Sequence, residues 1–238
     1  MKSLLPLVRV CSTGLLLLIS QCFAQEKIPP KAEHQEAERE LKQQEHQRIL
    51  GIVPEFNTSS LRNAAPLSPK EKFQLAFKST TDPFAFFAAA ADAGINQWED
   101  DFTGYGQGAE GFGKRFGAAY TDNFTGTILG NALFPVLFHQ DPRYFRKGTG
   151  SFMNRTWYAA LSTMRAKNDN GKWQPNYSNI LGNLAAGGIA NLYYPTTDRG
   201  VGLTFTRGVT VSFEGAIGAF FYEFWPDISH KLRHKHNP

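Results

Sequence analysis

Hydrophobic residues between residues 68 and 228 recur mainly at helical spacing. The segments that carry this pattern are 68–94, 112–135, 152–166, 178–194 and 200–224. Residues three and four positions apart lie on the same face of a helix, so each segment is predicted to be helical with an apolar stripe. The sequence therefore predicts a mainly α fold. It is a single bundle-like domain of about five to six helices rich in Gly and Ala.

Two short polar motifs predict where the first helices begin. Ser68-Pro69-Lys70-Glu71 combines a capping serine, a proline in the first turn and an acidic residue at the third position. Asp82-Pro83 has the same character and restarts the helix, which continues towards Gly94. The first helical segment is thus predicted as two consecutive helices.

Two longer apolar stripes follow. The first comprises Phe112, Phe116, Tyr120, Phe124 and Ile128. The second comprises Met153, Trp157, Leu161 and Met164. Pro135 is expected to kink or end the first helix, and Pro195 to stop the helix predicted at 178–194.

The segment 200–224 carries two conflicting patterns. Val201, Leu203 and Phe205 alternate with polar or small residues, as in a strand, whereas Ala216 and Ala219 have helical spacing. We predict a helix, because the segments before it are helical. The alternative is a partly β fold, with 200–224 as a hairpin that faces lipid.

The first 24 residues have the three parts of a secretory signal peptide. Lys2 and Arg9 make the start positive, an apolar run ending at Ile19 follows, and Cys22 and Ala24 occupy the small positions of a cleavage site. An exported protein is therefore predicted. The alternative is a lipoprotein signal in which Cys22 is kept and lipidated.

Flanking the domain, two polar segments are predicted. Residues 25–67 form a charged spacer and an extended arm, and residues 229–238 form a basic tail. We interpret the tail as a solvated terminus, with contact to anionic lipid head groups as the alternative. Loss of the signal's two basic residues lowers the net charge from +4 to +2, which gives no support for nucleic acid as a partner.

Cysteine and glycine usage narrow the chemistry further. The chain has two cysteines, Cys11 and Cys22, and both lie in the predicted signal, so no disulfide partner or thiolate is expected in the mature protein. Gly106, Gly108 and Gly111 match a G-x-G-x-x-G pattern, but no strand precedes them. We interpret residues 104–117 as the flexible start of a helix, and predict neither a cofactor nor a metal site.

A few polar residues next to apolar runs are candidates for a site. The weak catalytic candidates are His139, Asp141, Arg143 and Glu214. The favoured interpretation is structural, with Asp141 capping a helix or turn and Arg143 paired with a buried carboxylate. Asp122 and Glu214 interrupt apolar stretches and are expected to form ion pairs, for which the candidate partners are Arg115, Arg155 and Arg207.

Three segments of the chain resemble a group of exported bacterial proteins. They are residues 139–146 (HQDPRYFR), 191–195 (NLYYP) and 223–227 (EFWPD), and the resemblance covers roughly residues 70–230. No activity is assigned to that group, so the resemblance transfers no catalytic residue. It implies an exported, mainly helical domain.

The leading functional hypothesis is a non-enzymatic protein of the cell envelope. It would be a structural or binding protein, periplasmic or at the inner face of the outer membrane, with shallow contact to membrane lipid. One alternative is an envelope hydrolase that acts on lipid or cell-wall substrates through the four candidate residues. The other is a small outer-membrane β-barrel protein that uses 200–224 as strands.

Overall fold

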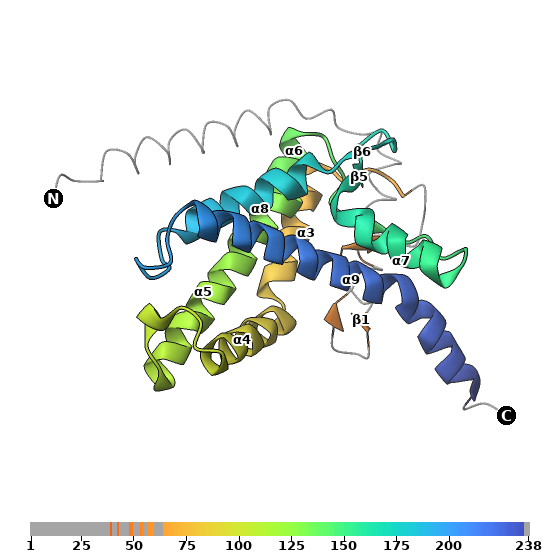
Figure 1. Ribbon diagram of the computed structural model, residues 1–238. Helices are drawn as coiled ribbons and strands as arrows, with labels where there is room; N and C mark the ends of the chain where they lie inside the picture. The colour runs from red at the N-terminus through yellow and green to blue at the C-terminus, as the bar shows by residue number, and fades with distance from the viewer. Residues whose placement is uncertain are drawn as a thin grey trace.

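The structure is a computed structural model that describes residues 64–235, together with Arg39, Lys42 and the short pieces 48–49, 53–54 and 57–59. Most of this part of the chain is helical, which confirms the predicted mainly α fold (Figure 1). The predicted signal peptide and most of the spacer lie outside the described residues.

The first two helices begin where the sequence predicts. Helix α3 (Pro69–Thr81) starts with a capping box in which the Ser68 hydroxyl and the Glu71 carboxylate bond each other's backbone amides. Helix α4 (Pro83–Trp98) starts at Asp82, whose carboxylate accepts a 2.9 Å bond from the amide of Phe84. Asp82 has an extended backbone, with ψ of 140°, so α3 ends there and α4 starts at the next residue, Pro83.

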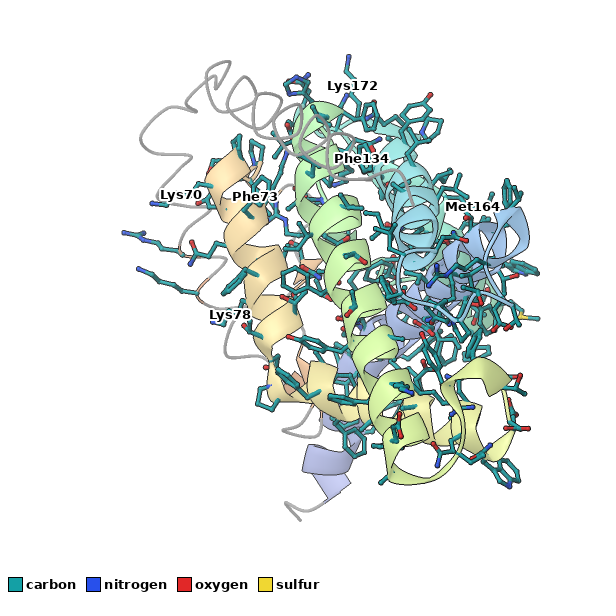
Figure 2. All side chains as sticks on the ribbon, turned by 90° about the vertical axis from the view of Figure 1, so that its left-hand side faces the viewer. Lys70, Phe73, Lys78, Phe134, Met164 and Lys172 are labelled. Atoms are coloured by element: carbon teal, nitrogen blue, oxygen red, sulfur yellow. The ribbon has the colours of Figure 1, made fainter. Side chains whose placement is uncertain are left out.

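A long helical rod forms the centre of the fold. It consists of α5 (Gly108–Ile128), a π-helical turn η2 (Leu129–Leu133) and α6 (Phe134–Leu137), and a 3₁₀ turn η1 (Thr103–Tyr105) precedes it. Figure 2 shows this rod between α3 and the later helix α8 (Tyr177–Ala190). The π turn lies directly before Pro135 and accommodates the missing amide, so the helix ends after Leu137 rather than at the proline.

The segment after the rod differs from the prediction. The sequence predicts a helix over 152–166, but α7 (Phe152–Ala160) ends at Ala160 and a 3₁₀ turn η3 (Leu161–Thr163) follows. The chain then forms a hairpin of β5 (Arg165–Lys167) and β6 (Trp173–Pro175). Pairing across the turn at 168–171 satisfies backbone groups that a longer helix would have used, and this competition ends the helix early.

The last two helices cross one another. Helix α8 packs against α9 (Val201–Lys235), which continues past α8 to reach α7 (Figure 1). A hairpin over 200–224 is therefore wrong, and α9 also extends through residues that we assigned to the tail. The outward side chains of α9 recur every four residues: Val201, Phe205, Val209, Phe213, Ile217 and Phe221.

Small residues form much of the buried core. Ala76, Ala93, Ala132, Ala159 and Ala190 are fully buried, whereas many Phe, Trp, Met and Ile side chains face outwards. Glycines let the helices approach closely: a Cβ at Gly182 would lie 2.6 Å from the Cα of Gly130. Within the described residues, none of the helices combines the length and the apolar character needed to cross a bilayer.

The described part of the arm lies against the body. Strand β3 (Thr58–Ser59) pairs in parallel with β4 (Tyr144–Phe145), and both residues of β3 are buried. A separate two-residue pair joins β1 (Arg48–Ile49) and β2 (Val53–Pro54) in antiparallel register. The segments before α3 and after α6 are thus brought together at β4.

Candidate functional site

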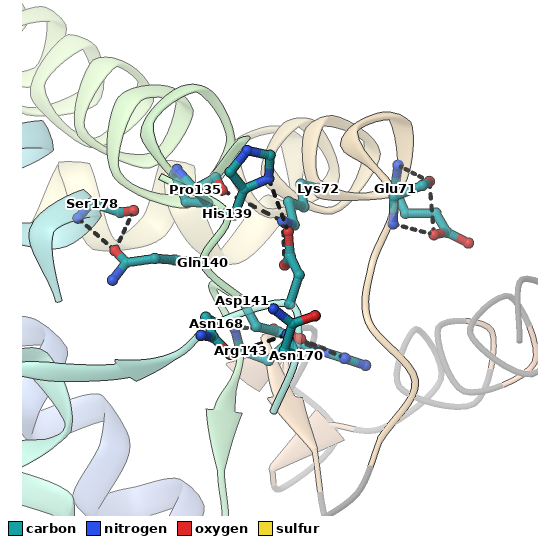
Figure 3. A network of polar contacts seen from close by, with 12 residues as sticks. Glu71, Lys72, Pro135, His139, Gln140, Asp141, Arg143, Asn168, Asn170 and Ser178 are labelled. Atoms are coloured by element: carbon teal, nitrogen blue, oxygen red, sulfur yellow. Dashed lines mark hydrogen bonds and ion pairs between the residues drawn. The ribbon is translucent and has the colours of Figure 1, made fainter. Parts of the chain in front are cut away.

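The loop after α6 contains three of the predicted site residues, and Gln140 fixes it in place. The Gln140 side chain is completely buried; its oxygen accepts bonds from the amide and hydroxyl of Ser178, at 2.9 and 2.6 Å (Figure 3). Its amide nitrogen donates to the carbonyl of Pro175 at 2.7 Å. Gln140 therefore ties the loop to the start of α8 and to the end of the β5–β6 hairpin.

Asp141 and Arg143 form a buried ion pair. The guanidinium of Arg143 binds the Asp141 carboxylate through Nε and Nη2, at 3.0 and 2.7 Å, and Nη2 also donates to the carbonyl of Ala65 at 2.6 Å. The Arg143 amide donates to the same carboxylate at 2.9 Å, which makes Asp141 a turn cap. This geometry agrees with the structural interpretation of both residues, since neither side chain faces solvent.

His139 lies at the corner between this loop and the hairpin. Its imidazole Nδ1 is 3.7 Å from Asp169 Oδ2, while the buried Lys72 approaches Asp169 Oδ1 from α3 at 2.7 Å (Figure 3). The His139 side chain is 76% exposed and its backbone is in the left-handed region, with φ of 51°. Asp169 therefore forms its shorter ion-pair contact with Lys72, and the exposed imidazole of His139 lies farther from it.

Glu214 lies apart from the other candidates. It is exposed on α9 and makes no hydrogen bond with His139, Asp141 or Arg143 in the part of the chain that the structure describes. The four predicted residues therefore do not form one polar constellation. Asp122, the other acidic residue that interrupts an apolar stretch, is buried and is 2.7 Å from Arg207, one of its predicted partners.

The Asp122 pair has two further donors. The hydroxyl of Tyr194 donates to Asp122 at 2.7 Å, and the hydroxyl of Tyr193 donates to its other oxygen. Burial, and then the charge of Asp122, raises the pKa of Tyr194 well above its ordinary value. The NLYYP segment is thus joined to the central rod by a fully bonded carboxylate, an arrangement that suits structure rather than proton transfer.

A second buried carboxylate, not singled out from the sequence, joins the other two segments of the resemblance. Glu223 has no exposed surface and accepts bonds from Tyr144 Oη, Arg155 Nε and the amides of Lys147 and Gly148, at 2.6 to 2.9 Å. One turn later, Asp227 binds Arg146 at 2.7 Å and also pairs with Arg155. The DPRYFR and EFWPD segments therefore meet around one ion-pair network.

Acid is expected to destabilise the protein through this network. Burial raises the pKa of Glu223, but the bonds from Tyr144, Arg155 and the two amides outweigh it and hold the pKa below its ordinary value of 4.5. A carboxyl with a lowered folded pKa stabilises the fold above its ordinary pKa, and this contribution is lost as the pH falls through the folded value. Urea unfolding at ~pH 6 and ~pH 3 should show the loss, with a smaller loss in Glu223→Gln. Equal pH dependence in both proteins would contradict this role for Glu223.

Beside this network, a cleft of about 730 Å³ opens between α7 and the hairpin. The lining residues come from β4, α7, β5 and β6 and from the turns between them: Phe145, Lys147, Asn154, Trp157, Tyr158, Leu161, Arg165, Lys167, Gly171 and Trp173. The HQDPR loop supports one wall, because the amide of Asp141 donates to the carbonyl of Lys167 at 2.8 Å. The HQDPR loop thus supports the wall of the cleft, but none of its residues lines the cleft.

Cationic groups in the cleft lie over aromatic rings. The Arg165 guanidinium is 4.5 Å from the centre of the Tyr158 ring and 5.0 Å from that of Trp173. Lys167 Nζ is 4.1 Å from the Phe145 ring centre, and Lys147 Nζ is 5.5 Å from that of Tyr158. Such contacts orient each cation in the cleft. Lys147 Nζ also donates a hydrogen bond to Asn154 Oδ1, which belongs to the same lining.

The lining has no acidic side chain among the residues that the structure describes. Arg165 Nε is buried and has no hydrogen-bond partner there, so one N–H donor of the guanidinium is unused. The cleft is therefore chemically suited to an anion that also carries an aromatic or acyl part.

Sequence reasoning missed the cleft, although one signal was present. Residues 142–168 contain six Arg or Lys side chains and no Asp or Glu, in a chain that is otherwise nearly balanced. The sequence does not single out Arg165, Lys167 and Trp173, because the first two lie at the predicted helix end and Trp173 lies beyond the predicted turn, whereas the structure pairs them in a hairpin. Trp157 was assigned to an apolar stripe and not to a binding site.

Neither a metal site nor a similarity to known proteins indicates the function. No group of three or more His, Cys, Asp or Glu side chains suited to a metal ion occurs among the described residues. The chain matches no family model, no curated protein and no solved structure. Function must therefore be argued from the cleft and from the sequence.

Proposed function

We propose that the protein is an exported binding protein of the cell envelope that takes an anionic, partly apolar ligand in the α7–hairpin cleft. The observation that carries the proposal is three cationic groups placed over aromatic rings in a cleft whose described lining has no carboxylate. The signal-peptide pattern at residues 1–24 supports export.

Binding is favoured over catalysis by the chemistry of the lining. General acid–base or nucleophilic catalysis needs a carboxylate, imidazole or activated hydroxyl or thiol in reach of the substrate. The described lining has no carboxylate, histidine, serine or cysteine, and the Tyr158 hydroxyl donates to the carbonyl of Phe145 at 2.8 Å. We therefore infer that the cleft holds a ligand without transforming it.

The proposal predicts selective binding of an anionic amphiphile. Arg165→Gln should weaken binding of monomeric dihexanoyl phosphatidic acid by about tenfold or more, because it removes a charge-assisted contact. Isothermal titration calorimetry measures this affinity. Zwitterionic dihexanoyl phosphatidylcholine should bind more weakly than the anionic lipid to the unchanged protein, because it offers no net charge to the cations.

Lys172→Gln is a matched control for the loss of charge. Lys172 lies in the turn of the same hairpin and is exposed, but it does not line the cleft. Its replacement should leave the affinity unchanged. Equal effects of the two substitutions, or equal affinity of the unchanged protein for the two lipids, would reject a specific anion site in the cleft.

A further inference from the structure

Helix α7 and the turn η3 that follows it present an apolar side outwards. The side chains of Met153, Trp157, Leu161 and Met164 are 44–63% exposed, and Phe152 beside them is 62% exposed. The same helix buries Arg155 and Ala159 on its inner side, with Arg155 in the Glu223 network. The polarity of α7 is thus reversed relative to a helix that packs its apolar stripe on a core.

We infer that this stripe is a membrane-docking surface, which places α7 at the surface of a bilayer that contains anionic lipid. The inference rests on the proposed function, because the ligand of the cleft would then be the head group of an anionic lipid. We define the docking stripe as Met153, Trp157, Leu161 and Met164. An amphipathic helix that lies in the interface buries such a stripe among the head groups and upper acyl chains.

The stripe and the cleft share residues. Trp157 and Leu161 belong to the docking stripe and also line the cleft, so the cleft opens at the stripe. Trp173, on the opposite wall, is also exposed. Tryptophan rings favour the head-group level of a bilayer because one end is apolar and the other carries an N–H donor. A lipid in the adjacent leaflet would therefore have its phosphate close to the cleft cations.

Charge complementarity selects an anionic bilayer over a second copy of the chain. Of the six basic side chains in residues 142–168, three are paired with carboxylates elsewhere in the chain (Arg143, Arg146 and Arg155). The other three, Lys147, Arg165 and Lys167, line the cleft at the stripe. Two copies joined through this face would bring like charges together, which opposes association. An anionic leaflet offers the opposite charge over the same area.

The test uses the full chain and vesicles of stated composition. We expect it to co-sediment with vesicles of phosphatidylcholine containing phosphatidylglycerol, more weakly with phosphatidylcholine alone, and less at high salt. Met164→Glu should reduce partitioning to the anionic vesicles by about tenfold or more, because it places a carboxylate in the docking stripe. The neutral substitution Met164→Gln should leave the affinity for monomeric dihexanoyl phosphatidic acid within about twofold, because it adds no charge beside Arg165 and Met164 does not line the cleft.

Leu192→Glu is the matched control for an exposed apolar residue. Leu192 is 77% exposed after α8, outside the docking stripe and the cleft, and its replacement should change neither measurement. Arg165→Gln should weaken both, since the head group needs the cleft. Circular dichroism of each variant checks that the helical fold is kept.

The outcomes separate the two proposals. Partitioning of Met164→Glu equal to that of the unchanged protein would overturn the docking stripe and leave the cleft proposal standing. If the unchanged protein does not bind monomeric dihexanoyl phosphatidic acid, the cleft proposal is wrong. Equal binding to vesicles with and without phosphatidylglycerol would show that docking does not require an anionic head group. Self-association in sedimentation velocity that Met164→Glu abolishes would assign the stripe to a second copy instead.

Discussion

Replacing Glu223 with alanine is expected to lower the free energy of unfolding by about 3–5 kcal/mol, the cost of removing one partner from a buried ion pair. The carboxylate has no exposed surface and is bonded by Tyr144, Arg155 and two backbone amides. Its loss leaves Arg155 Nε and three neutral donors without their acceptor, while Asp227 still pairs with Arg155.

Urea or thermal unfolding measures this effect, and Glu214→Ala on the same helix is the control. Glu214 is exposed, so its replacement should change the free energy of unfolding by no more than about 0.5 kcal/mol. Equal stability of the two variants would show that the Glu223 network does not hold β4, α7 and α9 together. It would also contradict our interpretation that the contact between the DPRYFR and EFWPD segments stabilises the fold.

The second large effect is expected at Gly187 in α8. A Cβ at this position would lie 2.3 Å from the carbonyl oxygen of Thr204 in α9, where the obstacle is backbone rather than a flexible side chain. Gly187→Ala should therefore separate the two helices and destabilise the protein by about 2 kcal/mol, despite the better helix propensity of alanine.

The neighbouring Gly188 provides the control for this prediction. A Cβ there meets nothing within 4 Å, and the residue is exposed on the same helix. Gly188→Ala should raise the melting temperature slightly, corresponding to about 0.5 kcal/mol, because alanine loses less backbone entropy on folding. If both substitutions change the melting temperature alike, α8 and α9 do not touch at Gly187.

The sequence predicts helix starts well, because their causes are local. Ser68 and Asp82 cap α3 and α4 with bonds to amides two or three residues away, next to prolines that cannot continue the preceding turn. The end of α7 was not predictable in the same way. The apolar spacing predicts a helix through Arg165, but pairing with the segment at Trp173, beyond the turn, makes Arg165 part of a strand instead.

The site was less predictable than the fold. A period of four shows that Met153, Trp157 and Leu161 share one face, but it does not show which way the face points. The Tyr144–Glu223 bond joins residues 79 positions apart, and no local pattern encodes that separation. Arg207 could be named as a partner of Asp122 only because a carboxylate within an apolar stretch requires one.

The four-residue repeat on α9 has a geometrical consequence for any flat partner. Each step of four residues turns an α-helix by about 400°, so successive outward side chains are displaced by about 40° around the axis. From Val201 to Phe221 the accumulated rotation is about 200°, and the stripe winds to the opposite side of the helix. Along α7 and η3 the corresponding rotation from Met153 to Met164 stays within about 80°, because the last step is three residues. A planar surface can therefore touch the whole α7 stripe at once, whereas it can meet the α9 stripe only a few side chains at a time.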